Sequence, residues 1–229
     1  QLLLGAVAVG LLLMGGPAAA LTVTDKVVIN EVCYDTVGTE SANEFIELYN
    51  AGDSVAYLDG AIISDRGQPT AGETAGVFPG SPGGRNIPIQ PGQYILIAMD
   101  AEADATPPDY STLADFEIHA GKNDFDNPNV PNLECFTSFA NEGLANDGDG
   151  VYLATGTDSV LTDGVNPATV VDGVNWGSVS DSTGWVLIGP NKEDDTPFPS
   201  ARSTSTTHKS IRRIPNGQDS NTTSSADFQ

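Results

Sequence analysis

Apolar and polar residues alternate in short runs along most of this chain, and Gly, Pro, Asn and Asp residues separate the runs. An apolar period of two residues, bounded by turn residues, is typical of β-strands. The expected strands cover residues 26–33, 44–50, 55–63, 87–89, 93–99, 150–154, 159–161, 169–176, 184–188 and 208–214. After residue 23, no stretch keeps the period of 3.6 residues that an amphipathic helix shows. The pattern therefore predicts an all-β protein.

Two long stretches between the expected strands are rich in turn residues. Residues 66–86 and 100–143 contain many Gly, Pro, Asp and Asn residues and few apolar runs. We expect long loop insertions there, with little regular structure apart from one short helix near residues 111–116. Residues 191–207 have the composition of a linker. By contrast, the run at 94–99 is apolar throughout, so its strand is expected to be covered on both faces.

The first 23 residues carry no charge. An apolar run at 2–14 is followed by Gly15-Gly16-Pro17 and then by small residues up to Ala20, which is the pattern of a secretory signal peptide. We therefore predict that residues 1–20 are a signal peptide, truncated at its start, and that the protein is secreted or displayed at the cell surface. An uncleaved membrane anchor is the alternative, because 23 uncharged residues are long enough to span a bilayer.

The charge is strongly negative and unevenly distributed. Asp and Glu number 31 against 9 Lys and Arg, but from residue 192 onward five acids face five bases. The whole excess of negative charge therefore precedes the C-terminal segment. Such a surface repels phosphate backbones, so nucleic acid is an unfavourable partner over most of the molecule.

The two cysteines, Cys33 and Cys135, suit an exported protein. A disulfide between them would close a loop of about 100 residues and contribute about 4–5 kcal/mol in the chain-entropy view. The alternative is two buried free thiols, since Cys33 stands in an apolar run, where cysteine behaves as a small hydrophobe.

Acidic and amide side chains stand inside several of the apolar runs, where they cost free energy unless they are paired. The first of them are Asn30, Glu31, Glu44, Glu47 and Asn50. Strand alternation places Glu44 and Glu47 on opposite faces, which argues against an acid/base pair. We interpret the set as partners for backbone N–H groups at strand ends and turns. Two cooperating glycosidase carboxylates would need an aromatic cleft, and only 7% of the residues are aromatic.

Several motifs, taken in chain order, resemble the lamin-tail domain family. They are Ile29-Asn30-Glu31, the segment 44–50, Leu58-Asp59-Gly60, the segment 91–94, the segment 144–153 with Asp149, and Val171-Asp172-Gly173-Val174. The resemblance covers residues 26–176, and residues 177–229 form a C-terminal extension with a last edge strand near 208–214. Segments 210–215, 217–219 and 226–228 are similar to the closing segment of exported bacterial members.

This resemblance implies an immunoglobulin-like β-sandwich, here with long loop insertions, and no catalytic activity. The implied role is a binding or structural module whose partner is a protein or a cell-surface polymer. Asp59, Gly60, Asp149 and Asp172 join the structural motif on this basis. The alternative is an accessory part of a secreted hydrolase or nuclease whose catalytic domain is missing from this chain.

Recognisable catalytic motifs are absent from the sequence. The two histidines, His119 and His208, are too few for a histidine-rich metal site, and no nucleophile elbow, phosphate loop or dinucleotide fingerprint occurs. Calcium is the one ligand that the sequence suggests. Asp124, Asp126, Asp147 and Asp149 bring oxygen ligands together, but neither cluster has the spacing of an EF-hand loop. We expect no cofactor, with calcium kept as an alternative.

Basic residues gather near the last expected strand. Lys209, Arg212 and Arg213 alternate with apolar side chains there. One interpretation is a patch for an acidic polymer or for a neighbouring copy of the chain, and the other is charge that protects an edge strand from aggregation.

Overall fold

The structure is a computed structural model. It describes residues 26–36, 43–64, 75–101, 109–118, 127–135, 144, 148–155, 170–177, 193–198, 209–219 and 227–229. The predicted signal peptide and the strands expected at 159–161 and 184–188 lie outside the described residues. Within the described part of the chain, no helix has the length and apolar character needed to span a bilayer.

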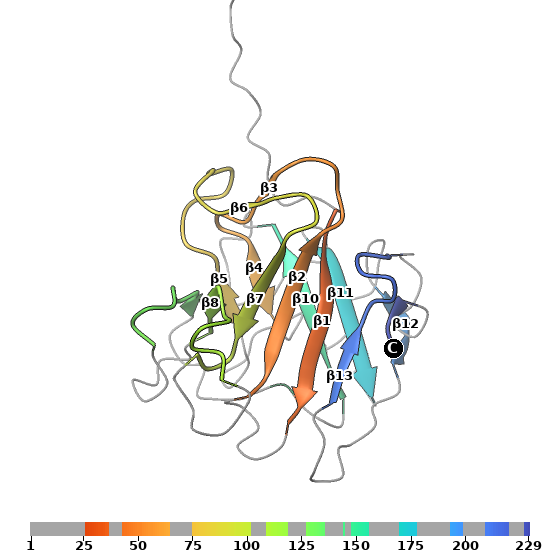
Figure 1. The fold of residues 1–229 in the computed structure, drawn as a ribbon. Coiled ribbons are helices and arrows are strands. Elements are labelled where there is room, and N and C mark those ends of the chain that lie inside the picture. The colour runs from red at the N-terminus through yellow and green to blue at the C-terminus, as the bar shows by residue number, and fades with distance from the viewer. Residues whose placement is uncertain are drawn as a thin grey trace, which may run out of the picture.

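The first of two large sheets has five strands, in the spatial order β13, β1, β2, β7, β8. Their bounds are β1 Val27–Asp35, β2 Phe45–Asn50, β7 Tyr94–Ala98, β8 Phe116–Glu117 and β13 Lys209–Arg212. The pairs from β13 to β7 are antiparallel, and β8 joins β7 in parallel. Strands from the two ends of the described chain thus lie side by side (Figure 1).

The second sheet has six strands, in the order β12, β11, β10, β4, β5, β9. Their bounds are β4 Ile62–Ser64, β5 Ala75–Val77, β9 Glu134–Cys135, β10 Gly148–Ala154, β11 Val170–Gly177 and β12 Glu193–Phe198. A separate two-stranded ribbon joins β3 Ala56–Tyr57 to β6 Pro88–Ile89. In Figure 1, β1, β2, β7 and β13 lie in front of β4, β10 and β11.

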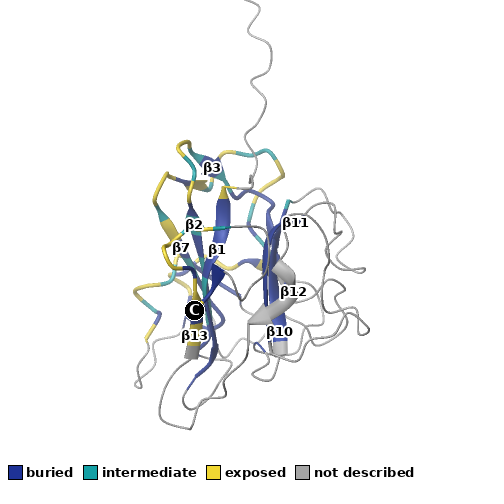
Figure 2. Ribbon diagram, turned by 90° about the vertical axis from the view of Figure 1, so that its right-hand side faces the viewer, coloured by how far each residue is buried: buried dark blue, intermediate teal, exposed yellow. Residues whose placement is uncertain are grey.

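The core lies between the two sheets. Ile29 of β1, Leu48 of β2 and Ile97 of β7 contribute to it from the first sheet, and Leu153 and Trp176 contribute from the second. All five side chains are fully buried. Figure 2 shows the layers from the side, with buried residues on strands of both sheets. The prediction of an all-β sandwich is therefore confirmed.

A β-bulge at Asn30 changes which residues of β1 face the core. Opposite β2, Ile29 pairs with Leu48 and Glu31 pairs with Glu47, so that Asn30 is an extra residue. Because of the extra residue, the positions of β1 that face inward before the bulge and those that face inward after it differ by an odd number of residues. Ile29 before the bulge and Val32 after it therefore both reach the core, although they are three residues apart.

The run at 55–63, expected as one strand, is two strands of different sheets. β3 ends at Tyr57, and β4 begins at Ile62. The turn between them contains Gly60 with φ of +70°. A positive φ requires glycine at this position and redirects the chain from the ribbon into the second sheet.

The two long insertions contain more regular structure than expected. β5 lies in the first, and β8 and β9 lie in the second. The helix expected at 111–116 is wrong, because Ala114 closes a single turn onto the carbonyl of Tyr110 and Asp115 then donates to Leu96 of β7. Pairing with β7 thus ends the turn before a helix can extend. β12 is also unexpected, since it falls in the stretch interpreted as a linker.

The predicted disulfide is absent. Cys33 is a free, buried thiol in β1 of the first sheet, whereas the backbone of Cys135 pairs with Gly76 in the second sheet. The two cysteines therefore belong to different layers. Burial raises the pKa of the Cys33 thiol to about 12, so it behaves as a small apolar side chain.

Candidate functional site

The most extensive polar network of the described residues surrounds Arg213. This residue follows β13 directly, and its main-chain N–H donates to the carbonyl of Asn30 at 2.8 Å. Because Ile211 faces the core, alternation sends the Arg213 side chain inward as well. Arg213 is fully buried, with an exposed fraction of 0%.

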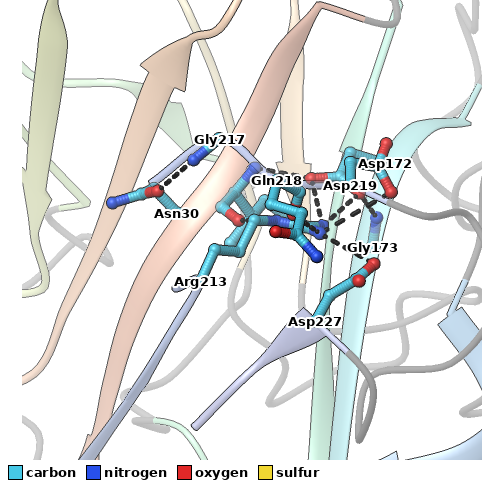
Figure 3. A network of polar contacts seen from close by, with 9 residues as sticks. Asn30, Asp172, Gly173, Arg213, Gly217, Gln218, Asp219 and Asp227 are labelled. Atoms are coloured by element: carbon cyan, nitrogen blue, oxygen red, sulfur yellow. Dashed lines mark hydrogen bonds and ion pairs between the residues drawn. The ribbon is translucent and has the colours of Figure 1, made fainter. Parts of the chain in front are cut away.

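All three guanidinium nitrogens of Arg213 are hydrogen-bonded (Figure 3). Nε donates to the carbonyl of Ile29 at 2.8 Å, and Nη1 donates to the carbonyl of Gln218 at 2.8 Å. Nη2 donates to Asp172 Oδ1 at 2.9 Å and to Oδ2 at 3.1 Å. Planar donors at fixed angles suit arginine to such a site, where lysine would fill fewer of the bonds.

Asp172 links Arg213 to both sheets. It lies in β11 of the second sheet, and its Oδ2 accepts the main-chain N–H of Ile29 in β1 at 2.6 Å. Its Oδ1 also accepts the N–H of Gly173 at 2.9 Å. One carboxylate thus joins strands of two layers to the buried arginine.

Two further carboxylates and one aromatic ring complete the network. Asp227 Oδ2 lies 3.3 Å from Nη1 of Arg213, and Asp219 Oδ1 lies 3.6 Å from the same atom. The ring of Phe228 covers the guanidinium, with its centroid 4.5 Å from Cζ. The main chain of Gln229 exchanges two hydrogen bonds with Arg212. Residues 227–229 are thereby held along the edge of β13 that does not pair with β1.

The electrostatics of the network suit a structural centre. Desolvation raises the pKa of Asp172 to about 6, although the adjacent Arg213 lowers it. Burying two charges is costly, but leaving one of them unpaired costs more. Among the described residues, no group of three or more His, Cys, Asp and Glu side chains has an arrangement that could hold a metal ion.

The bulge residue Asn30 forms a second centre beside the first. Its Nδ2 donates to Glu47 Oε1 at 2.8 Å, and its Oδ1 accepts the main-chain N–H of Gly217 at 2.9 Å. Burial raises the pKa of Glu47. Glu47 therefore orients Asn30, and Asn30 holds the turn that supplies the Gln218 carbonyl to Arg213.

Asp59 organises the turn between β3 and β4. It accepts the main-chain N–H groups of Asn86 and Ile87 at 3.0 and 2.9 Å, and the side-chain amide of Asn86 at 2.8 Å. Burial by itself would raise the pKa of Asp59, but these hydrogen bonds lower it. The predicted motif residues Asp59 and Gly60 therefore act together to fix this turn.

Glu44 and Asn50, at the two ends of β2, bind main-chain groups outside this strand. Glu44 is fully buried, and its Oε2 accepts the N–H of Leu144 at 2.7 Å. Asn50 accepts from Gly52 and donates to the carbonyls of Ser54 and Ile89. The prediction that Glu44 and Glu47 face opposite sides of the strand agrees with the alternation of buried and half-buried residues along β2.

Two further residues of the predicted set, Glu31 and Asp149, lie within the described strands. Glu31 is half-buried, opposite Glu47. Asp149 is buried, and its Oδ1 accepts the N–H of the next residue, Gly150. The other residues of the calcium prediction, Asp124, Asp126 and Asp147, lie outside the described residues.

The predicted basic patch is wrong at Arg213, and the side chain of Lys209 lies outside the described part of the structure. Arg212 is exposed, but Arg213 is buried and neutralised by carboxylates. The alternation of residues 208–214 contains the signal for burial, because Arg213 falls on the same face of the strand as the apolar Ile211. The partners Asp219, Asp227 and Phe228 lie in segments that the family resemblance includes, but no sequence period relates them to Arg213, so their contact with it is not predictable from the sequence.

The family model described as "Lamin Tail Domain" matches residues 21–177, which is more than half of the chain. No curated protein matches the sequence.

A solved structure resembles the fold. It is the crystal structure of a DUF4876 family protein from Bacteroides thetaiotaomicron VPI-5482, with a TM-score of 0.57 and 15% sequence identity. The similarity covers 90% of this chain and 71% of that chain. At this identity the likeness concerns the fold alone.

Proposed function

Because this chain belongs to the lamin tail domain family, whose fold is immunoglobulin-like, we propose that it is an exported, non-catalytic module that binds a protein or a cell-surface polymer. The observation that supports this proposal is the use of the motif side chains. Asp59, Asp172 and Glu44 all accept main-chain N–H groups from segments far away in the sequence. Carboxylates occupied in this way stabilise a scaffold and are poorly placed to act on a substrate.

The charge of the chain supports a choice among partners. A formal net charge of −22 disfavours polyanions such as nucleic acid. Neutral polymers, or proteins with a basic surface, meet no such repulsion. The scaffold would present its loops and outer sheet faces to a partner of this kind, as binding residues on rigid sandwiches commonly do.

Cell fractionation tests the export. An antibody against the purified chain should detect the protein in the medium or on intact cells, where added protease should degrade it. A cytoplasmic protein of the same cells should remain intact as the control. Detection only after cell lysis would contradict the proposed location.

Co-sedimentation tests the binding. Purified residues 21–229 should sediment saturably with isolated cell envelopes. Protease treatment of the envelopes should abolish binding to a protein partner, whereas periodate oxidation should abolish binding to a polysaccharide. Absence of saturable binding would contradict the module's binding role. Release of soluble envelope fragments by the pure chain would contradict its classification as non-catalytic.

A further inference from the structure

The turn after Arg213 contains the only Asn-Gly pair of the sequence, Asn216-Gly217. Ile214, Pro215 and Asn216 are exposed, and Gly217 has φ of +72°. Asparagine is a chemically labile residue, and its side-chain amide reacts most easily when the next residue has no side chain to obstruct the approach of its main-chain nitrogen. The reactivity of this turn does not depend on the proposed binding function.

The fold requires the glycine of this pair. A Cβ atom at position 217 would lie 2.6 Å from Cε1 of Tyr49 and 2.8 Å from Cβ of Ala51. The positive φ also disfavours any other residue. A bulkier residue at 217, which would slow the reaction, is therefore not available to this protein.

The reacting nitrogen is held by Asn30. The N–H of Gly217 donates to Asn30 Oδ1 at 2.9 Å, and Asn30 is itself only 2% exposed. Glu47 fixes the orientation of Asn30 through the bond to its Nδ2. To attack, the Gly217 nitrogen must leave this acceptor.

The amide that would be attacked is held by Tyr94. Asn216 Nδ2 donates to the hydroxyl of Tyr94 at 2.6 Å. The Tyr94 ring packs on that of Tyr49, with 4.7 Å between their centroids. The leaving nitrogen is thus bonded to β7 while the nucleophile is bonded to β1, so that reaction requires local opening of the turn.

We propose that Asn216 is a modification site that loses ammonia by attack of the Gly217 nitrogen, and that Asn30 and Tyr94 restrain this reaction in the folded protein. In the first step a bond forms between the Gly217 nitrogen and Asn216 Cγ, and the bond from Cγ to Nδ2 breaks. Nδ2 leaves as ammonia with the proton of the Gly217 N–H. Solvent water then opens the cyclic imide on either side, giving aspartate or isoaspartate without any change of oxidation state.

The product alters the Arg213 network. Isoaspartate inserts a methylene into the main chain between residues 216 and 217, which displaces the bond from Gly217 to Asn30. The neighbouring Gln218 carbonyl, an acceptor for Arg213 Nη1, is shifted with it. Modified molecules accumulate with time and whenever the turn opens. In these molecules the last strand, β13, is less stable.

Mass spectrometry of the full chain tests the proposal. The protein is incubated at mildly alkaline pH in buffer and in urea, then digested with trypsin, and the fragment beginning at Ile214 is sequenced. Asn221, which precedes Thr222 in the same fragment, is the internal reference. We expect Asn216 to react at least about tenfold faster in urea than in buffer, which corresponds to about 1.4 kcal/mol of restraint.

Variants identify the restraints. Asn30→Ala and Tyr94→Phe should each accelerate the reaction of Asn216 in buffer severalfold and leave the rate in urea unchanged. Tyr94→Phe changes a partly exposed ring, so it keeps the test valid should Asn30→Ala fail to fold. Tyr57→Phe removes the same hydroxyl from a tyrosine of the β3–β6 ribbon; it is the matched control and should change neither rate. Equal rates in buffer and urea for the unsubstituted chain, or no reaction in urea, would overturn the proposal.

Discussion

At the scale of single residues, Arg213 is a fully buried charge, and burial of a charge is costly unless it is paired. Its charge lies in the interior, where it is stabilised by Asp172 in the second sheet and by Asp227 near the end of the chain. A buried pair of this kind contributes little net stability relative to an apolar core, but removing one partner leaves the other uncompensated. The bonds also fix geometry, because Arg213 contacts Ile29, Asp172 and Gln218 at the same time.

Arg213→Gln should therefore be strongly destabilising. We expect the free energy of unfolding to fall by about 3–5 kcal/mol, because buried carboxylates lose their counter-charge. Urea denaturation monitored by tryptophan fluorescence measures this change. Arg212→Gln, one residue earlier on the exposed face, should change stability by less than about 0.5 kcal/mol. Similar losses for both variants would contradict the assignment of Arg213 as the centre of the network.

Asp172 gives the network a dependence on pH. Its pKa is raised from 3.8 to about 6 in the folded chain, so the folded state holds this proton more tightly than the unfolded state. The associated stability is complete below pH 3.8 and is lost as the pH rises through about 6. The direction is opposite to that of a carboxylate whose pKa is lowered by folding, such as Asp59.

Comparison with Asp172→Asn isolates this effect, because all other titrating groups are common to both proteins. The free energy of unfolding of the unsubstituted chain, minus that of Asp172→Asn, should decrease by up to about 3 kcal/mol between pH 4 and pH 7. Denaturation at several pH values provides the measurement. A difference that increases with pH would show that Arg213 lowers the pKa of Asp172 more than burial raises it.

At the scale of elements, the sequence predicted strands well wherever alternation was uninterrupted. β2 and β11 lie where apolar residues alternate with polar ones or form a compact run. The prediction failed where tertiary pairing decides the structure. β5 and β9 are short strands that pair with each other, and their sequences lack enough alternation to be recognised. The bulge at Asn30 was also invisible, since it depends on the register with β2.

Gly60, in the turn between β3 and β4, and Gly92, between β6 and β7, allow two costs of replacing a glycine to be separated. One cost is backbone strain, and the other is steric overlap of the new Cβ atom. Gly60 and Gly92 have similar φ values, +70° and +74°. A Cβ at Gly60 would lie 2.7 Å from the Pro82 nitrogen, whereas at Gly92 the nearest atom is 3.9 Å away. Gly92→Ala should therefore incur only the backbone cost, about 1 kcal/mol, and Gly60→Ala should incur a larger one, because Pro82 must also move. Equal losses in thermal unfolding would show that the turn relaxes freely.

At the scale of the whole molecule, the polar networks join regions that the sequence keeps far apart. Asp172 in β11 binds the main chain of β1, Glu44 binds that of Leu144, and Arg213 joins both of the large sheets. The family resemblance indicated which residues belong to this scaffold, but the resemblance could not show which atoms they bind. Such contacts depend on how the layers face each other, and strand periodicity carries no information about that.

The acidic excess leads to a prediction for the complete chain. A net charge of −22 destabilises a compact state through repulsion among the charges, and salt shortens the range of this repulsion from about 30 Å at 0.01 M to about 3 Å at 1 M. We therefore expect added sodium chloride to raise the urea midpoint of the unsubstituted chain. The Arg213 network is buried and little screened, so the loss caused by Arg213→Gln should be nearly the same at low and high salt. If salt instead reduced that loss substantially, the network would be exposed to solvent, and the closure of the two sheets around it would have to be revised.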